Sequence, residues 1–115
     1  MDYRIGRFRV LAAVLAGMVS CAAAPAALAA PDDERGRSLV RLVRQDCGAC
    51  HGMLLTGGLG PALSPDALRD RPREALVATV LGGRPGTPMP PWRGLLTEDE
   101  AGWIVDRLQA GFPER

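Results

Sequence analysis

The stretch Cys47-Gly48-Ala49-Cys50-His51 decides how this chain folds. Two cysteines three residues apart place both thiols on one face of a helical turn, and a histidine directly follows the second cysteine. This spacing is the attachment signature of a c-type haem, whose two vinyl groups react with the thiols while the histidine ligates the iron. We therefore expect Cys47 and Cys50 to hold one covalent haem c, with His51 as an axial ligand.

A Cys-x-x-Cys pair has other uses, and the rest of the chain argues against each of them. A thioredoxin-like redox pair needs a surrounding βαβ unit, of which the sequence gives no sign. A closed zinc site needs four nitrogen or sulfur ligands, but beyond residue 29 the chain offers only Cys47, Cys50 and His51. A disulfide between the two cysteines would close a very small loop and stabilise little.

Residues 1–29 have the features of a secretory signal peptide. Three arginines lie within the first nine residues, and Val10–Val19 is an apolar stretch, shorter than the ~20 residues that a membrane span needs. Ala27-Leu28-Ala29 fits the small-residue cleavage pattern, so we expect cleavage after Ala29 and a periplasmic protein. Two alternatives stay open: a retained membrane anchor, and lipidation at Cys21, whose preceding residues form a poor lipid-attachment motif.

Residues 30–115 then form one small monohaem domain. A chain of this size is only marginally stable on its own, and a covalently bound haem would supply the missing stabilisation. Acidic residues outnumber arginines by one in this range, and lysine is absent. This balance argues against a nucleic-acid partner, which requires a clearly basic face. After signal cleavage we expect no stable membrane insertion.

Helical signals dominate this domain, and no alternating apolar stretch is long enough for a strand, so we predict an all-α fold. The clearest start signal is a capping box, with Thr97 as the cap and Glu100 three residues later. Gly111 and Pro113 end that helix. We predict helices over about 33–46 and 98–110, with shorter helices beginning at Ser64-Pro65 and at Pro72.

The second axial ligand is predicted by elimination. His51 is the only histidine, the two methionines of the signal peptide are removed, and Met53 lies too close to His51 to reach the opposite side of a haem. Met89 remains, held between Pro88 and Pro90, although a lone methionine usually fills a core. Methionine ligation raises the reduction potential, and an iron with both axial positions filled favours electron transfer over catalysis.

These motifs resemble those of the class I cytochromes c. The resemblance rests on the Cys47–His51 motif, on Gly60-Pro61-Ala62-Leu63 and on Pro88-Met89-Pro90, flanked by terminal helices. It implies a small fold wrapped around one haem, with the N- and C-terminal helices crossing. It also implies that the carbonyl of Pro61 accepts the ring N–H of His51 and orients the ring.

The resemblance also implies a glycine and aromatic side chains where the terminal helices cross. Gly36 matches the glycine. Val40 stands where members of the family commonly have an aromatic residue. Trp103, from the last helix, is the aromatic residue that could take its place.

Further matches, including Gly111-Phe112-Pro113 near the end of the chain, narrow the resemblance to cytochrome c55X. The cytochromes c55X are small periplasmic cytochromes of the NirC type that accompany the haem-containing dissimilatory nitrite reductase. The resemblance implies a single-electron carrier that donates to nitrite reductase in denitrification, with redox proteins as partners and no catalytic residues of its own. A maturation factor for the reductase's haem cofactor is the alternative. A small peroxidase would need a vacant axial position, which Met89 argues against.

Overall fold

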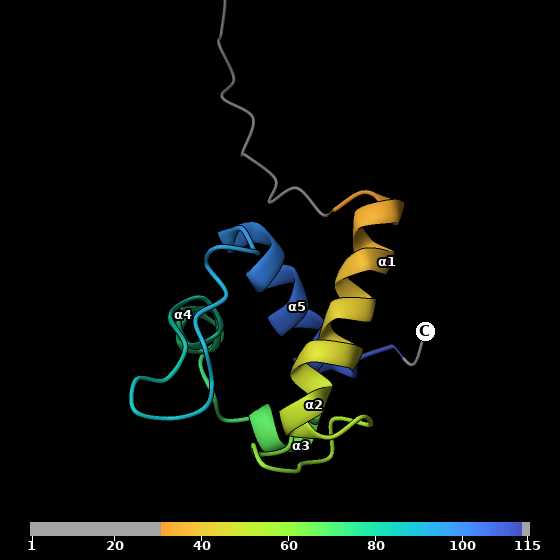
Figure 1. Ribbon diagram of the computed structural model, residues 1–115. Helices are drawn as coiled ribbons and strands as arrows, with labels where there is room; N and C mark the ends of the chain where they lie inside the picture. The colour runs from red at the N-terminus through yellow and green to blue at the C-terminus, as the bar shows by residue number, and fades with distance from the viewer. Residues whose placement is uncertain (1–30, 114–115) are drawn as a thin grey trace, which may run out of the picture.

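The computed structural model describes residues 31–113, and this part of the chain is built from helices without any strand. The all-α prediction is therefore correct. The expected signal peptide, 1–29, lies outside the described residues, as does Cys21. Figure 1 shows the helices packed around a common centre. They are α1 (Asp33–Leu42), the π-helical turn η1 (Val43–Cys47), α2 (Gly48–His51), α3 (Pro65–Leu68), α4 (Arg73–Gly82) and α5 (Glu98–Ala110).

The first three segments form one continuous helical run, which passes the predicted end near residue 46 and reaches His51. Asp32 caps its start, because the side chain accepts a hydrogen bond from the Arg35 amide at 2.7 Å. The run continues through η1, where the Gly48 amide donates to the Val43 carbonyl. Such π turns are rare, and apolar periodicity does not predict them. The haem-attachment motif is thus part of the first helical run.

The shorter helices begin close to where their caps predict. The Ser64 hydroxyl accepts a hydrogen bond from the Ala67 amide at 3.4 Å, and Pro65 is the first residue of α3. α4 begins directly after Pro72, which is its N-cap. Its C-cap is Gly83, whose φ of 65° favours glycine.

The last helix has the predicted limits, Glu98–Ala110, and the predicted capping box. The Thr97 hydroxyl accepts from the Glu100 amide at 3.2 Å, and the Glu100 carboxylate accepts from the Thr97 amide at 2.9 Å. Both bonds satisfy amides that a free helix end would leave unpaired. This end of α5 is therefore determined by local sequence.

The terminal helices α1 and α5 meet, as the family resemblance implies. Arg35 and Glu100 form an ion pair of 2.5 Å between them. A Cβ at Gly36 would lie 3.9 Å from the Trp103 ring, so Trp103 is the aromatic residue at this glycine. That spacing is ordinary van der Waals contact, so the crossing would also accept an alanine.

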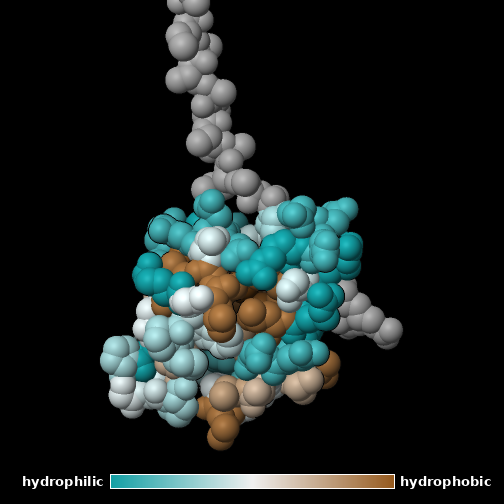
Figure 2. All heavy atoms as spheres, turned by 45° about the horizontal axis from the view of Figure 1, so that its top comes forward, coloured by the Kyte–Doolittle hydropathy of each residue, from teal (hydrophilic) through white to brown (hydrophobic). Residues whose placement is uncertain are grey.

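The apolar core lies between the helices. Its largest fully buried side chains are Leu39, Val43, Ile104 and Val105, from the first helical run and the last helix. Figure 2 shows apolar residues gathered in the middle of one face and ringed by hydrophilic residues. None of the helices within residues 31–113 combines the length and the hydropathy of a membrane span.

Candidate haem site

The attachment motif places its two thiols at the end of the first helical run. Cys47 is the last residue of η1 and Cys50 lies in α2, and both are free, half-buried thiols. Burial raises the pKa of the Cys47 thiol to about 11, and the neighbouring Asp46 carboxylate contributes to the rise. A thiol-based redox pair needs a thiolate near neutral pH. Cys47 is thus poorly suited to that chemistry.

The ring of His51 is oriented by a hydrogen bond to the backbone. Its Nδ1 atom lies 2.7 Å from the carbonyl oxygen of Pro61. A carbonyl carries no hydrogen, so Nδ1 must donate and the lone pair of Nε2 is left free. A histidine that binds a metal through Nε2 is commonly held by such a bond. This is the contact that the family resemblance implies for Pro61.

Gly60 makes this arrangement possible. A Cβ at this position would lie 2.7 Å from Cε1 of the His51 ring, closer than real Cβ atoms come to their neighbours. The Gly60 amide also donates to the Cys50 carbonyl at 2.7 Å. The backbone therefore passes directly against the histidine ring, and only glycine leaves enough room.

The loop between α2 and α3 is anchored to the motif and to the core. The Gly57 amide donates to the His51 carbonyl at 2.8 Å. Leu55 is 3 % exposed and adopts a φ of 60°, which is uncommon outside glycine. Burial of its side chain offsets the cost of that conformation. These contacts make the loop a fixed support for His51.

Met89 is presented from a different part of the chain, the connection between α4 and α5. It is half-buried, its carbonyl accepts from the Arg84 amide at 3.1 Å, and its amide donates to the Thr87 hydroxyl at 3.3 Å. Both bonds stay within its own loop, and no hydrogen bond within residues 31–113 joins Met89 to the attachment motif. A Cβ at Gly83 would lie 2.8 Å from the Met89 carbonyl oxygen, so this loop also depends on a glycine.

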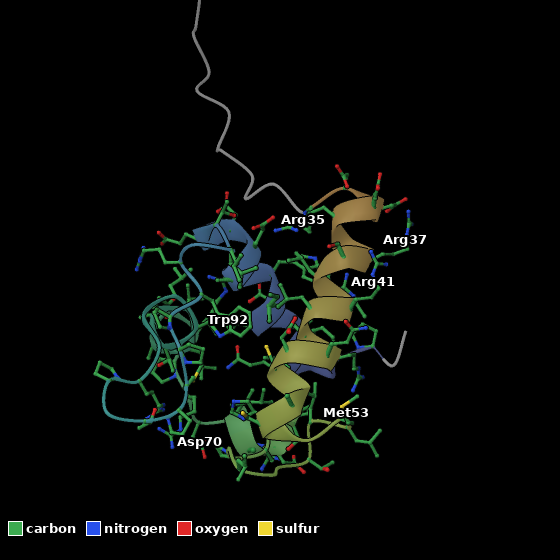
Figure 3. The ribbon with its side chains drawn as sticks, in the orientation of Figure 1. Arg35, Arg37, Arg41, Met53, Asp70 and Trp92 are labelled. Atoms are coloured by element: carbon green, nitrogen blue, oxygen red, sulfur yellow. The ribbon has the colours of Figure 1, made fainter. Side chains whose placement is uncertain are left out.

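The end of this loop is attached to α4. The amide of Trp92 donates to the Val80 carbonyl and that of Arg93 to the Leu81 carbonyl, each at 3.2 Å. Figure 3 shows Trp92 reaching from the loop toward the middle of the molecule, where it packs against the core. Met89 therefore lies on a loop that is held at both ends.

Met53 occupies a different environment. Its side chain is 63 % exposed. A Cβ on Gly48 would lie 3.7 Å from its sulfur, so Met53 covers the helix that carries the motif. The sulfur is thus placed against the outside of that helix.

Arg44 has a structural role that no sequence pattern indicated. Its guanidinium donates to the Met53 carbonyl at 3.2 Å and to the Pro113 carbonyl at 2.6 Å, and it lies 5.4 Å from the centre of the Phe112 ring. Arg44 thereby ties η1 to the loop after His51 and to the C-terminal tail. A single arginine has no local signature, so only the folded chain reveals this role.

Taken together, these residues fit one haem c. The motif supplies two unpaired thiols on one helical turn. The Pro61 hydrogen bond leaves one ring nitrogen of His51 available for a metal. Gly60 and Gly83 keep the backbone close where a side chain would not fit.

Comparison with known proteins agrees with this interpretation of the site. Residues 34–106 match the protein family described as cytochrome C oxidase, cbb3-type, subunit III. Cytochrome c55X of Pseudomonas aeruginosa is 57 % identical, over 96 % of this chain and 92 % of that protein. The solved structure of the c-type cytochrome NirC is 67 % identical with a TM-score of 0.70, over 71 % of this chain and 96 % of that one.

A third relative is much larger. The dihydro-heme d1 dehydrogenase of Pseudomonas aeruginosa is 41 % identical over 63 % of this chain, but the match covers only 15 % of that protein. A domain like this one is therefore one part of a longer chain there.

Fold and motif thus define a c-type cytochrome with a class I fold and covalent haem c, a carrier of electrons. The chain belongs to the cytochrome c55X family, because it matches a member of that family over nearly its whole length.

Proposed function

We propose that this protein is a periplasmic single-electron carrier that donates electrons to dissimilatory nitrite reductase in denitrification. Cys47 and Cys50 hold the haem, His51 and Met89 are its axial ligands, and Pro61 orients His51. When bound, haem c supplies a centre that takes up and releases one electron at a time. The protein has no catalytic function of its own.

The observation that carries this proposal is the fixing of both candidate ligands. Pro61 holds the His51 ring with Nε2 free, and Met89 lies on a loop bonded to itself and to α4. Ligands that move little between oxidation states keep reorganisation small, as electron transfer requires. With His51 and Met89 both bound to the iron, no position would be left for a substrate.

The reductase as partner is supported by the relatives rather than by the site. The NirC-type cytochromes resemble this chain over most of its length. Periplasmic export is supported by the features of residues 1–29, with cleavage after Ala29 and a mature domain of residues 30–115. Attachment of haem c takes place on that side of the bacterial membrane.

The first test is the visible and near-infrared spectrum of the exported protein. His51 and Met89 together predict a low-spin spectrum with a sulfur-to-iron band in the oxidised state and no change on adding carbon monoxide to the reduced state. A high-spin spectrum that carbon monoxide alters would contradict Met89 as a ligand. The reduced protein is then mixed with nitrite reductase from the same organism, and rapid oxidation of the haem is expected.

A second candidate function is supported by one specific observation. A domain like this one is part of a relative named as a dihydro-heme d1 dehydrogenase. This favours the alternative of a maturation factor, in which the same redox centre assists completion of the reductase's haem cofactor. A deletion strain distinguishes the two, because a carrier leaves the reductase with its full cofactor and a maturation factor does not.

A further inference from the structure

The surface between α1 and α5 is hollowed into a groove with a volume of about 760 Å³. Arginines from the first helical run and from α5 line this groove. Figure 3 shows two of them, Arg37 and Arg41, projecting from the same side of α1. We call this surface the arginine groove and define it by Arg37, Arg41, Arg44 and Arg107, together with the apolar Val40 and Trp103.

Among residues 31–113, none of the arginines of the groove forms an ion pair. The ion pairs there involve three other arginines, Arg35, Arg69 and Arg73. Arg107 lies 4.9 Å from the centre of the Trp103 ring, and the hydrogen bonds that Arg44 makes among residues 31–113 go to backbone carbonyls. These contacts orient the two guanidiniums without cancelling their charge.

Helix stability explains only part of this arrangement: Arg37 lies four residues after Asp33, a spacing at which an acid followed by a base stabilises a helix. Arg37 and Arg41 are one helical turn apart on α1, a spacing at which like charges destabilise a helix. A cation near a helix C-terminus is favoured by the dipole, but the helical run continues beyond Arg41 to His51. Asp33 and Glu34, in contrast, lie in the first turn, where the dipole favours them.

The neighbouring groove, between α4 and α5, has the opposite charge balance. Four carboxylates and two arginines line it, and Trp103 borders both grooves. The arginine groove has four arginines against Asp32 and Asp33, which lie at the start of α1. The fold therefore separates charges that are almost balanced along the sequence.

We propose that the arginine groove docks an extended acidic segment of a redox partner protein. This inference rests on the proposed function as an electron carrier. Planar guanidiniums pair well with carboxylates. Arg37 and Arg41 are about 6 Å apart along α1, a length that about two residues of extended chain cover. A flat lipid surface cannot enter a concave groove in the same way.

The position of the groove agrees with this use. It includes Arg44, which lies in the same turn, η1, as Cys47. A partner bound there lies next to the helix that carries the haem-attachment motif.

The test uses the haem-loaded protein and a fluorescein-labelled acidic peptide, an oligoglutamate, at low ionic strength. The variant Arg37→Gln/Arg41→Gln removes two exposed charges from the groove. The control Arg71→Gln/Arg93→Gln removes the same charge from exposed arginines elsewhere. We expect the groove variant to bind the peptide about five- to tenfold more weakly, as two exposed charge pairs imply, and the control to stay within about twofold.

Three results would overturn the inference. The first is failure of the unmodified protein to bind the peptide, and the second is equal weakening in both variants, which would mean that only net charge matters. The third is binding to vesicles containing anionic phosphatidylglycerol without binding to the peptide, which would mean a lipid surface. None of these results bears on the carrier function, because spectrum, potential and electron transfer to nitrite reductase are measured separately.

Discussion

At the scale of single residues, the haem site depends on two positions that orient the His51 ring, one through a hydrogen bond and one through the absence of a side chain. The carbonyl oxygen of Pro61 accepts a hydrogen bond from the His51 ring at 2.7 Å. Gly60 has no side chain that would collide with this ring. The motif residues and Pro61 could be named from the sequence, because their spacing and the family resemblance are specific. The need for glycine at position 60 could not, since it arises from a contact between two segments that only the fold brings together.

Replacing the proposed sulfur ligand is the most direct test at this scale. In Met89→Ala the iron loses a ligand that favours the reduced state, so the reduction potential is expected to fall by on the order of 0.1 V, within the ~0.8 V range that axial ligands cover. The reduced variant should also bind carbon monoxide. Potentiometric titration and the carbon monoxide difference spectrum measure both effects. An unchanged potential with no carbon monoxide binding would show that Met89 is not a ligand.

A matched pair of glycine substitutions tests the support of His51. Gly60→Ala would push a Cβ to 2.7 Å from the ring, whereas a Cβ at Gly94 meets nothing within 4 Å. Overpacking of this kind costs about 1–3 kcal/mol, so we expect Gly60→Ala to destabilise the protein and to shift the iron toward high spin. Gly94→Ala should change stability by less than ~0.5 kcal/mol. Urea unfolding and the oxidised spectrum report the two effects, and equal behaviour of both variants would refute the argument.

At the scale of helices, the two ends of the domain differ in how well the sequence predicts them. The limits of α5 are correct because Thr97 and Glu100 form a capping box within one short stretch. The predicted end of the first helical run, near residue 46, is too early, because α2 continues the run to His51 after the π turn η1. A capping motif predicts the helix end at which it lies, whereas no local signal in this sequence predicts the π turn.

The ion pair between the terminal helices predicts a pH dependence of stability. The hydrogen bond from Arg35 lowers the pKa of Glu100 to about 2 from the usual 4.5. The folded state thus favours the ionised carboxylate. This stabilisation is fully present above about pH 4.5 and is lost as the pH falls through about 2.

The variant Glu100→Gln isolates this pair, because a glutamine can still accept the amide bond of the capping box. We expect it to lower the free energy of unfolding by about 1 kcal/mol at pH 7. The difference from the unmodified protein should shrink once the pH falls below the usual pKa of a glutamate, 4.5. Urea titrations from neutral to strongly acidic pH measure this difference, and a value that stays constant would exclude the ion pair as its source.

At the scale of the whole molecule, segments far apart in the sequence are joined by contacts that no local sequence pattern predicts. Arg44 links the first helical run to the loop after His51 and to the tail at Phe112 and Pro113. The sign of a docking face likewise cannot be predicted from a sequence whose charges nearly balance. It emerges only when the first helical run and α5 place their arginines along one groove.

The domain as a whole is expected to need its haem. Within residues 31–113 the fully buried core is aliphatic throughout, with no large aromatic side chain, and small domains rarely stand without an additional link. The double variant Cys47→Ser/Cys50→Ser should therefore lose covalent haem and most of its helical circular dichroism. The single variant Cys47→Ser, with one thioether left, should stay helical. A double variant that remains helical without haem would disprove this dependence.

The two grooves that flank Trp103 give the molecule a further property. Positive charge collects between α1 and α5, and negative charge between α4 and α5, while the total stays close to zero. Such a molecule has an electric dipole moment. Because its net charge is small, a charged partner at long range attracts it only weakly, but the partner's field rotates the molecule. The side with the arginine groove would then face an acidic partner before contact, so that encounters begin in a productive orientation.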